Sequence, residues 1–254
     1  MQDPHIHQAA EIICSVKRVT AFTGAGISAE SGIPPFRGPN GLWSRYDSSI
    51  LDIHHFYQDP VRSWSIIKKI FYENFQAAIP NAAHFALSDM EAHGHIHAVI
   101  TQNIDNLHQK AGSQVVIEYH GSSQRLICRK CGRIYPVTEE LLLDLPPLCP
   151  NCHQVLKPDF VFFGEPIPVK AHQNALRETR ASDVWLIIGT TGEVFPAASL
   201  PLEAKSHGKK IIEINIEPSS YTPQITDIFL QGTAASVLSE MNSWIRKIDV
   251  LHAG

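Results

Sequence analysis

Short runs of apolar and mostly β-branched residues recur along the chain, and each run ends in polar residues or glycine. The six runs span 19–23, 97–102, 115–120, 184–190, 210–216 and 227–232. Most of them lack the apolar–polar alternation of a half-exposed strand, so they predict strands covered on both faces, as in a parallel sheet. Four helical patterns separate several of these runs, at 80–94, 168–181, 196–207 and 233–247. Alternating strands and helices predict an α/β fold built on a doubly wound parallel sheet.

Two segments interrupt this alternation. Residues 39–79 contain no clear strand and carry aromatic residues within helical patterns, around Phe56, Trp64 and Phe71. Residues 122–158 contain two cysteine pairs, prolines and short strand patterns. Both segments are interpreted as insertions, which leaves residues 1–38, 80–121 and 159–254 for the α/β fold itself.

The composition is that of an ordinary globular protein, with 44% hydrophobic and 18% charged residues among 254. The net charge of −4 offers no basic excess, so nucleic acid is not expected as the main partner. No apolar run approaches the roughly 20 residues of a membrane-spanning helix, so no membrane partner is expected. The first 16 residues carry an early acid and no long apolar core, which predicts no signal peptide and a cytoplasmic location.

A glycine-rich segment follows the first predicted strand. Gly24, Gly26 and Ala29 fit G-x-G-x-x-[G/A], a pattern that lets backbone N–H groups approach a phosphate of a dinucleotide. A tight structural turn would need much the same residues. Pro34 and Pro35 then end any helix within about two turns. The sequence therefore predicts a long loop that could close over a cofactor.

Polar residues also follow the next two predicted strands. Gln102, Asn103 and Asp105 begin where a parallel sheet presents its ligands, although one of them could simply cap the next helix. His120 ends the strand at 115–120, and imidazole suits a general base because its pKa lies near neutrality. A packed or surface histidine is the alternative. His108 is interpreted as structural, and His93, His95 and His97 as exposed polar residues.

Four of the five cysteines form two C-x-x-C pairs, Cys128 with Cys131 and Cys149 with Cys152, separated by 17 residues. This spacing predicts a zinc ribbon whose four thiolates close the coordination sphere, so the Zn²⁺ would be structural. Redox-active pairs are the alternative, and the neighbouring His153 is a possible substitute ligand. The fifth cysteine, Cys14, lies in an apolar helical pattern and is expected to be a buried packing residue.

Taken together, these motifs resemble those of the sirtuins, the family of NAD-dependent protein deacylases. Residues 24–38 (GAGISAESGIPPFRG), 101–108 (TQNIDNLH), 119–122 (YHGS), the cysteine pairs, 161–165 (VFFGE), 189–198 (GTTGEVFPAA) and 214–218 (INIEP) occur in the family's order. The resemblance covers roughly residues 8–245. It implies a Rossmann-like domain, a small domain formed by the two insertions, and an active site in the cleft between them. Gly192 and Glu193 depart from the family's pattern.

The resemblance also implies roles for individual residues. NAD, consumed as a co-substrate, would contact Gly24, Ala25, Gly26, Glu30, Phe36 and Arg37. Its nicotinamide ribose would lie at the catalytic residues Asn103, Asp105 and His120, with Gln102 beside them and His120 as the base. Its adenosine half would contact Gly189, Thr190, Thr191, Asn215, Ile216, Glu217 and Ala234. An acyl-lysine peptide would pair by strand addition with Val161, Phe162, Phe163, Gly164 and Glu165.

The implied reaction removes the acyl group from lysine and yields nicotinamide and O-acyl-ADP-ribose. Desuccinylase-type sirtuins resemble one another in a Tyr-x-x-Arg pair whose positions here hold Ile67 and Ile70. These isoleucines cannot neutralise a carboxylate, so neutral acyl groups are expected, unless Lys68 or Lys69 turns inward. A mono-ADP-ribosyltransferase is the alternative enzyme. A zinc-ribbon module that binds nucleic acid or protein is the alternative from another class.

Overall fold

The computed structural model describes residues 3–36, 41–73 and 77–253. Its largest element is a six-stranded parallel sheet of order β3-β2-β1-β7-β8-β9. The strands are β1 (Val19–Thr23), β2 (Ala98–Thr101), β3 (Val116–Glu118), β7 (Val184–Ile188), β8 (Lys210–Asn215) and β9 (Ile228–Gln231). Each predicted strand is therefore present, most of them a little shorter than its sequence pattern. The strand order reverses between β1 and β7, as in a Rossmann-like sheet.

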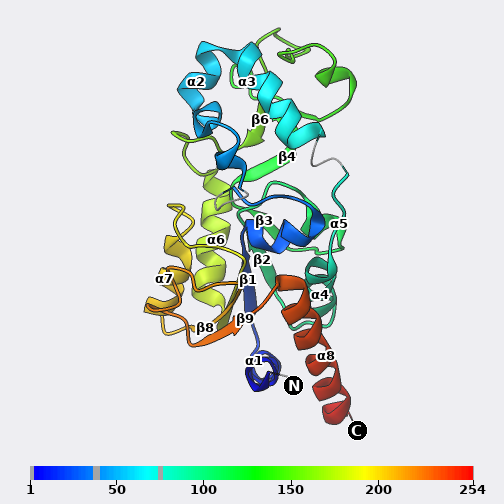
Figure 1. Ribbon diagram of the computed structural model, residues 1–254, viewed down its shortest axis with the longest axis vertical. Helices are drawn as coiled ribbons and strands as arrows, with labels where there is room; N and C mark the ends of the chain where they lie inside the picture. Colours follow the sequence, from blue (N-terminus) through cyan, green and yellow to red (C-terminus); the bar gives the residue numbers. More distant parts are fainter. Residues whose placement is uncertain (1–2, 37–40, 74–76, 254) are drawn as a thin grey trace.

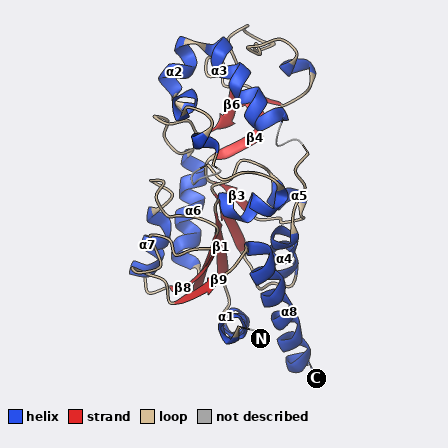
Figure 2. Cartoon of the chain, viewed as in Figure 1, coloured by secondary structure: helices blue, strands red, loops and turns tan. Residues whose placement is uncertain are grey.

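Helices cover both faces of this sheet, as Figures 1 and 2 show. One face carries α1 (Pro4–Ser15), α4 (Ala82–Ala92) and α8 (Ala234–Ala253), and the other carries α6 (Val169–Ala181) and α7 (Ser199–Ser206). Every residue of β1 and β7 is buried, which explains why these strands show no alternation. The short α5 (Leu107–Lys110) follows the polar residues after β2.

A second, smaller unit lies at the opposite end of the molecule from the termini (Figure 1). It contains an antiparallel sheet of β4 (Gly121–Ile127), β5 (Ile134–Pro136) and β6 (Lys157–Phe160), in the order β5-β4-β6. It also contains α2 (Ile53–Gln58), α3 (Pro60–Ile67) and a π-helical turn, Lys68–Glu73. The buried Trp64 connects the helices of this unit to its sheet, because its indole N–H donates at 2.8 Å to the carbonyl of Leu156, the residue before β6. The predicted domain limits stay a prediction; the small sheet reaches one or two residues beyond 122–158 at each end.

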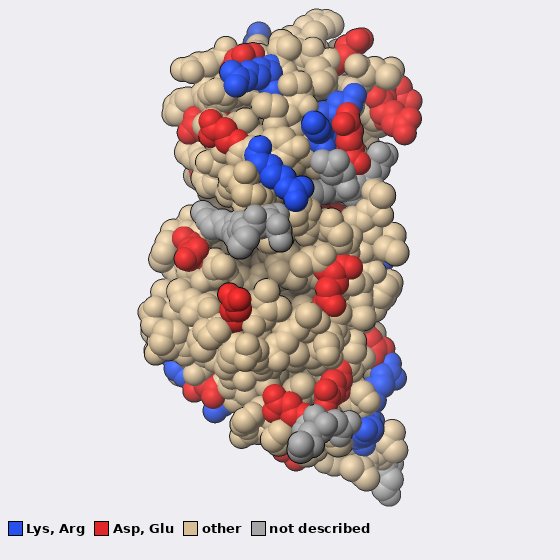
Figure 3. Space-filling model, viewed as in Figure 1, with Lys and Arg blue, Asp and Glu red and all other residues tan. Residues whose placement is uncertain are grey.

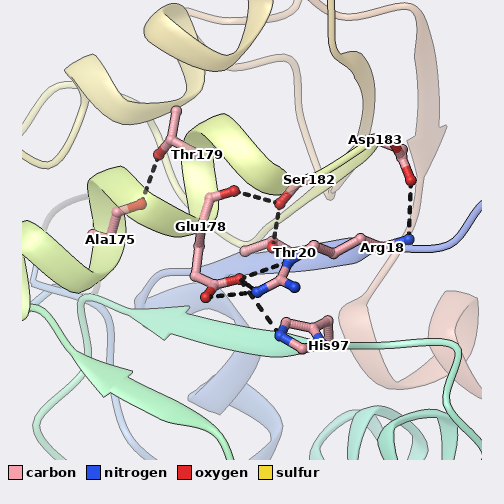
Figure 4. A network of polar contacts seen from close by, with 8 residues as sticks. All are labelled: Arg18, Thr20, His97, Ala175, Glu178, Thr179, Ser182 and Asp183. Atoms are coloured by element: carbon pink, nitrogen blue, oxygen red, sulfur yellow. Dashed lines mark hydrogen bonds and ion pairs between the residues drawn. The ribbon is translucent and has the colours of Figure 1, made fainter.

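A buried polar brace ties the sheet together at the amino ends of its strands (Figure 4). Glu178 on α6 is 3% exposed, and it accepts from the Arg18 guanidinium at 2.8 and 3.2 Å. His97, which precedes β2, lies 3.9 Å from the same carboxylate. Thr20 on β1 and Ser182 after α6 share a hydrogen bond. Side-chain hydrogen bonds therefore stabilise the amino ends of these strands. Ligand sites of parallel sheets lie at the opposite, carboxyl ends.

Charged side chains of both signs are scattered over the face shown in Figure 3. No helix among the described residues is long and apolar enough to cross a membrane. The expected cytoplasmic location, and the expectation that nucleic acid is not the main partner, stay predictions.

Candidate active site

Two loops cross at the carboxyl edge of the sheet, where the strand order reverses. The Gly26 N–H donates to the Gly189 carbonyl at 2.8 Å, and the Gly24 N–H donates to the Ile188 carbonyl at 3.0 Å. A Cβ atom on Gly26 would lie 2.7 Å from the Gly189 Cα, and one on Gly24 would lie 2.7 Å from the Thr190 Cβ. The glycines therefore serve the close approach of these two loops, and their own N–H groups are already bonded there.

Replacing Gly189 by alanine tests this crossing. Gly189 has φ +60°, and its Cβ would meet the Ile27 nitrogen at 2.5 Å. We expect a loss of unfolding free energy of about 1–3 kcal/mol from the clash, beyond the backbone strain, and weaker binding of ADP-ribose by calorimetry. Gly208→Ala is the matched control, because Gly208 has φ +74° and open space around it. Equal losses in the two variants would refute the packing role.

Ser28 joins the glycine loop to the polar residues after β2. Its hydroxyl donates to Asp105 Oδ2 at 2.7 Å and accepts from Asn103 Nδ2 at 3.2 Å. Asn103 also donates to the Gly24 carbonyl at 3.1 Å, and burial raises the pKa of Asp105. Asn103 and Asp105 are thus brought together with the loop, as expected. The sequence did not single out Ser28. Its hydroxyl is fully buried, and a buried polar group needs hydrogen-bond partners, which here are two predicted site residues.

Two buried histidines, His84 and His108, pack against this hydrogen-bond network. His84 Nε2 faces the Ser28 hydroxyl at 3.4 Å, and because that hydroxyl already donates to Asp105, it can only accept from Nε2. His84 Nδ1 then accepts from the Asn81 N–H at 3.3 Å. His108 Nε2 lies 3.0 Å from the Thr23 hydroxyl, and the two imidazole rings are 5.0 Å apart. His108 is therefore structural, as interpreted. Burial lowers the pKa of His84 to about 4 and that of His108 to about 3.

These two pKa values predict acid sensitivity. Unfolding returns both imidazoles to a pKa of about 6.5, so below that pH the unfolded chain binds protons that the folded chain excludes. The free energy of unfolding should fall as pH drops from 6.5 toward 4, by up to about 2.7 kcal/mol per pH unit for both groups together. Urea unfolding at several pH values measures it. His108→Leu should flatten the slope, whereas the exposed His54→Gln should not; a flat wild-type profile would contradict the account.

His120 stands at the junction of β3 and β4 with its tautomer set. Its Nδ1 lies 3.0 Å from the Gln102 carbonyl, which can only accept, so Nδ1 carries the proton. The lone pair is therefore on Nε2. Burial lowers the pKa of His120, which keeps the imidazole neutral at pH 7. Gln102 in turn donates from Nε2 to the Thr190 hydroxyl at 3.1 Å. The arrangement supplies a neutral base beside the crossing of the two loops.

The residues expected at the adenosine half lie after β7 and β8. Asn215 Nδ2 donates to the Thr190 carbonyl at 3.0 Å, which joins the two strand ends. Thr191, Ile216 and Glu217 are exposed. Ala234 begins α8, and the Glu30 carboxylate accepts from the next backbone N–H, that of Ala235, at 3.1 Å. In this structure Glu30 therefore caps α8.

The unusual Gly192 has a local explanation. Its φ is +74°, and a Cβ there would meet Ser220 Oγ at 2.3 Å and the Tyr221 ring at 2.7 Å. The Ser220 N–H donates to the Thr191 carbonyl at 3.1 Å, so the loop after β8 packs directly on the loop after β7. Only glycine fits this contact.

The expected peptide strand at 161–165 is not a regular strand in this structure. The Phe163 N–H donates to the Leu51 carbonyl at 2.7 Å, and its carbonyl accepts from the Ile53 N–H at 3.1 Å. The Val161 N–H donates to the His120 carbonyl at 2.8 Å. Much of this backbone is thus already paired. The segment does run beside His120.

A buried ion pair anchors the end of this segment. The Lys157 ammonium, 2% exposed as a residue, lies 2.9 Å from Glu165 Oε2 and also donates to the Phe160 carbonyl at 2.6 Å. The same carboxylate oxygen accepts from the Phe162 N–H at 3.0 Å. Lys157 also lies 4.0 Å from the centre of the Phe162 ring. Glu165 therefore holds the segment from within, although its sequence motif suggested a peptide contact.

The two isoleucines expected to line an acyl pocket lie in a core, and their role at such a pocket stays a prediction. Ile67 and Ile70 are both 0% exposed and pack in the core of the small unit. The Lys68 ammonium donates to the Leu142 carbonyl at 2.8 Å, and Lys69 is exposed, so neither supplies a cation to that core. Phe36 packs nearby, with its ring centre 5.4 Å from that of Trp43. Arg37 lies outside the described residues.

The four cysteines converge as the spacing predicts. Their sulfur atoms all lie within 4.8 Å of one another, with Cys128 and Cys152 at 3.4 Å and Cys131 and Cys149 at 3.7 Å. A tetrahedral ion with Zn–S bonds of about 2.3 Å requires sulfur separations of about 3.8 Å. The set therefore fits Zn²⁺ with little adjustment.

The residue after each cysteine pair is left-handed. Gly132 has φ +72° and His153 has φ +56°. Their N–H groups donate to the carbonyls of Cys128 and Cys149, each at 2.8 Å. The same turn thus closes both pairs, and His153 belongs to the turn rather than to the cluster of cysteine ligands.

Comparisons with known proteins agree with this geometry. The model of the Sir2 family matches residues 24–196. The chain is similar to the NAD-dependent protein deacylase 2 of Pyrobaculum aerophilum, with 44% identity over 242 residues, 94% of this chain and 95% of the relative. It is also similar to a mutant Sir2 homologue in complex with ADP-ribose, with a TM-score of 0.91, 38% identity and 99% of each chain covered. A Sir2 complex with p53 peptide and NAD⁺ matches with a TM-score of 0.85 and 32% identity, over 96% of this chain and 98% of that one.

Proposed function

Because this chain belongs to the Sir2 family, we propose that it is an NAD-dependent protein deacylase that removes acyl groups from lysine side chains. The acyl group passes to ADP-ribose, and nicotinamide is released. The observation that carries the proposal is His120, a neutral imidazole whose Nδ1 donates to the Gln102 carbonyl and leaves the lone pair on Nε2. Gln102 in turn contacts Thr190 next to the Gly189 loop. A ribose hydroxyl is a very weak nucleophile, and a base at this position would activate it.

Residues that follow different strands would bind different parts of NAD. Backbone N–H groups of the glycine loop other than those of Gly24, Gly26 and Ile27, which are bonded within the protein, would face the phosphates. Thr190 and Asn215 would hold the adenosine half. Asn103 and Asp105 would contact the nicotinamide ribose. Asp105 suits a ribose hydroxyl because its Oδ1 and Oδ2 already accept from the Leu107 N–H and from Ser28, which fix the carboxylate in place. A contact of Arg37 with NAD is proposed from the family resemblance of the sequence alone.

The four cysteines would hold one structural Zn²⁺ that contributes folding energy to the small unit. With four thiolates the ion has no free position, so it would take no part in the reaction. The substrate would be an acyl-lysine segment of another protein, lying along 161–165 next to His120. Because this mode of binding reads the peptide backbone, the sequence preference should be loose.

A simple test separates this proposal from its alternative. The protein is incubated with an acetyl-lysine peptide, with and without NAD, and all products are followed by mass spectrometry. Loss of acetyl only with NAD, together with O-acetyl-ADP-ribose, is the expected result. ADP-ribose attached to protein, with the acetyl group retained, would instead identify a mono-ADP-ribosyltransferase.

We further propose that neutral acyl groups are preferred. The cations of 60–73 are Arg62, Lys68 and Lys69; the first and last are exposed, and Lys68 is bound to a carbonyl. A succinyl carboxylate buried next to the core of the small unit would have none of these cations to pair with, which costs several kcal/mol. In a competition between acetyl- and succinyl-lysine peptides of one sequence, acetyl should be removed at least about 100-fold faster. Faster removal of succinyl would refute the preference and leave the deacylase activity intact.

A further inference from the structure

Three metal-ligating side chains from separate elements meet at the end of the large unit that carries the chain termini. Cys14 lies in the last turn of α1, His95 in the loop before β2, and Asp249 in α8. Their sulfur, nitrogen and oxygen atoms all lie within 4.8 Å of one another. Figure 1 shows α1 and the carboxyl-terminal part of α8 at this same end. We propose that Cys14, His95 and Asp249 form a second metal site, for a divalent transition ion of the zinc class.

The donor set matches that ion. Thiolate, imidazole and carboxylate are the three protein ligands of Zn²⁺, with bonds of about 2.0–2.3 Å. Such bonds place tetrahedral donors about 3.3–3.8 Å apart, so the cluster needs only small side-chain movements. His95 Nε2 now lies 2.8 Å from Asp249 Oδ2, and an ion between them would separate the two. Three protein ligands leave the fourth position to water, which can enter past Asp249, whose side chain is 39% exposed.

The histidine run around this cluster shows that His95 is placed differently from its neighbours. His93 Nδ1 contacts the Asp89 carbonyl at 2.8 Å, and His97 faces Glu178. His95 alone of the three reaches α8, and its side chain is only 15% exposed. The expectation that all three are exposed polar residues is therefore wrong for His95.

Cys14 also differs from its expectation. It packs against the core only in part, and it shares its surroundings with a carboxylate and an imidazole. Burial and the Asp249 charge raise the pKa of the Cys14 thiol to about 11. A bound dication would displace the thiol proton to solvent and form the sulfur–metal bond.

Two cations on α8 near the cluster, Arg246 and Lys247, have partners of their own. Arg246 on α8 pairs with Asp89 on α4. The Lys247 ammonium lies 4.3 Å from the centre of the Trp244 ring, and His7 on α1 contacts the same ring, 4.5 Å between centres. A bound ion would therefore be held by the three cluster residues and would fasten α1 to α8 and to the loop before β2. Its effect should be on stability, because the cluster lies at the end of the sheet opposite His120.

Titration of the zinc-loaded, full-length protein with Co²⁺ tests the proposal. The wild type should take up one further equivalent, with the near-ultraviolet absorption of a Co²⁺–thiolate bond and no loss of bound zinc. Cys14→Ala should abolish that absorption and weaken binding at least about 100-fold, since even indirect partners of a metal site contribute 10–100-fold. His95→Ala should weaken it similarly. His93→Ala, two residues away, is the matched control and should bind as the wild type does.

A second readout guards against misfolded variants. Zn²⁺ at about 100 times its dissociation constant should raise the Tm of the wild type by about 5 °C or more, and should leave that of Cys14→Ala unchanged. Deacylase turnover should be unaffected in both, which keeps this test independent of the proposed function. No further equivalent in the wild type, or unchanged affinity in both Cys14→Ala and His95→Ala, would overturn the proposal.

Discussion

Replacing His120 by alanine should lower kcat/KM for deacylation by about 10²- to 10⁴-fold, the usual contribution of a general base. The Gln102 carbonyl fixes the His120 proton on Nδ1, so Nε2 alone can take a proton, and alanine removes it. Steady-state kinetics with an acetyl-lysine peptide measure the loss. The Tm and the affinity for ADP-ribose should change little, because His120 is only half-buried and its side chain makes one hydrogen bond in the structure.

The pH profile distinguishes a base from a structural residue. Because burial lowers the pKa of His120, the acid limb of kcat/KM should have an apparent pKa below 6.5, and activity should fall as pH drops through it. His120→Asn keeps a similar size without a base and should be as inactive as the alanine variant. A well-folded His120→Ala enzyme with near-normal turnover would remove His120 from this role.

Loss of one zinc ligand should have the largest effect on folding. Cys128 and Cys149 are both fully buried in the core of the small unit, so the ion and that core form together. Structural zinc contributes about 10–16 kcal/mol of binding free energy in isolated small domains. Cys149→Ala should therefore release zinc and expose β4, β5 and β6 to amide hydrogen exchange, and it should abolish activity because β4 begins directly after His120.

The matched control lies four residues further on. His153→Gly keeps all four thiolates and relieves a left-handed backbone in a residue with a side chain, so it should retain zinc and be slightly more stable. Zinc content by mass spectrometry and thermal unfolding give both answers. Full zinc retention and native exchange protection in Cys149→Ala would contradict the structural role, whereas zinc loss from His153→Gly would mean that the turn, not the thiolates alone, decides binding.

The parallel sheet could be predicted because its strands are covered on both faces. Strands such as VWLII are then apolar throughout, a pattern that one sequence displays directly. The cysteine quartet was equally visible, since each C-x-x-C pair is local. The polar residues after β2 and β3 followed from the rule that parallel sheets bind ligands at the carboxyl ends of their strands. Those after β7 and β8 came from the family resemblance alone.

The support of the site could not be predicted, because its contacts join distant residues. Ser28 meets Asp105 across 77 positions of sequence, and His84 meets Ser28 across 56. The residues next to His84 in the sequence do not indicate that this helical histidine is buried against the glycine loop. The same holds for Gly192, whose need for glycine comes from Tyr221 in a different loop.

The peptide and acyl positions depend on local backbone geometry that the sequence pattern does not display. Ile67 and Ile70 fall on opposite sides of the point where α3 becomes a π-helical turn, so counting along one regular helix did not describe their surroundings. The segment 161–165 was expected as a strand, but Phe163 pairs with only one short stretch, at Leu51 and Ile53. Both facts depend on tertiary packing.

The most direct test of the central claim is the balance of products in a single reaction. The protein is incubated with NAD and an acetyl-lysine peptide, and free-lysine peptide, nicotinamide and O-acetyl-ADP-ribose are quantified together by mass spectrometry. We expect the three products to rise in equimolar amounts and none of them to form without NAD. Deacetylation with free acetate and no consumption of NAD, or nicotinamide release with the acetyl group still on the peptide, would contradict it.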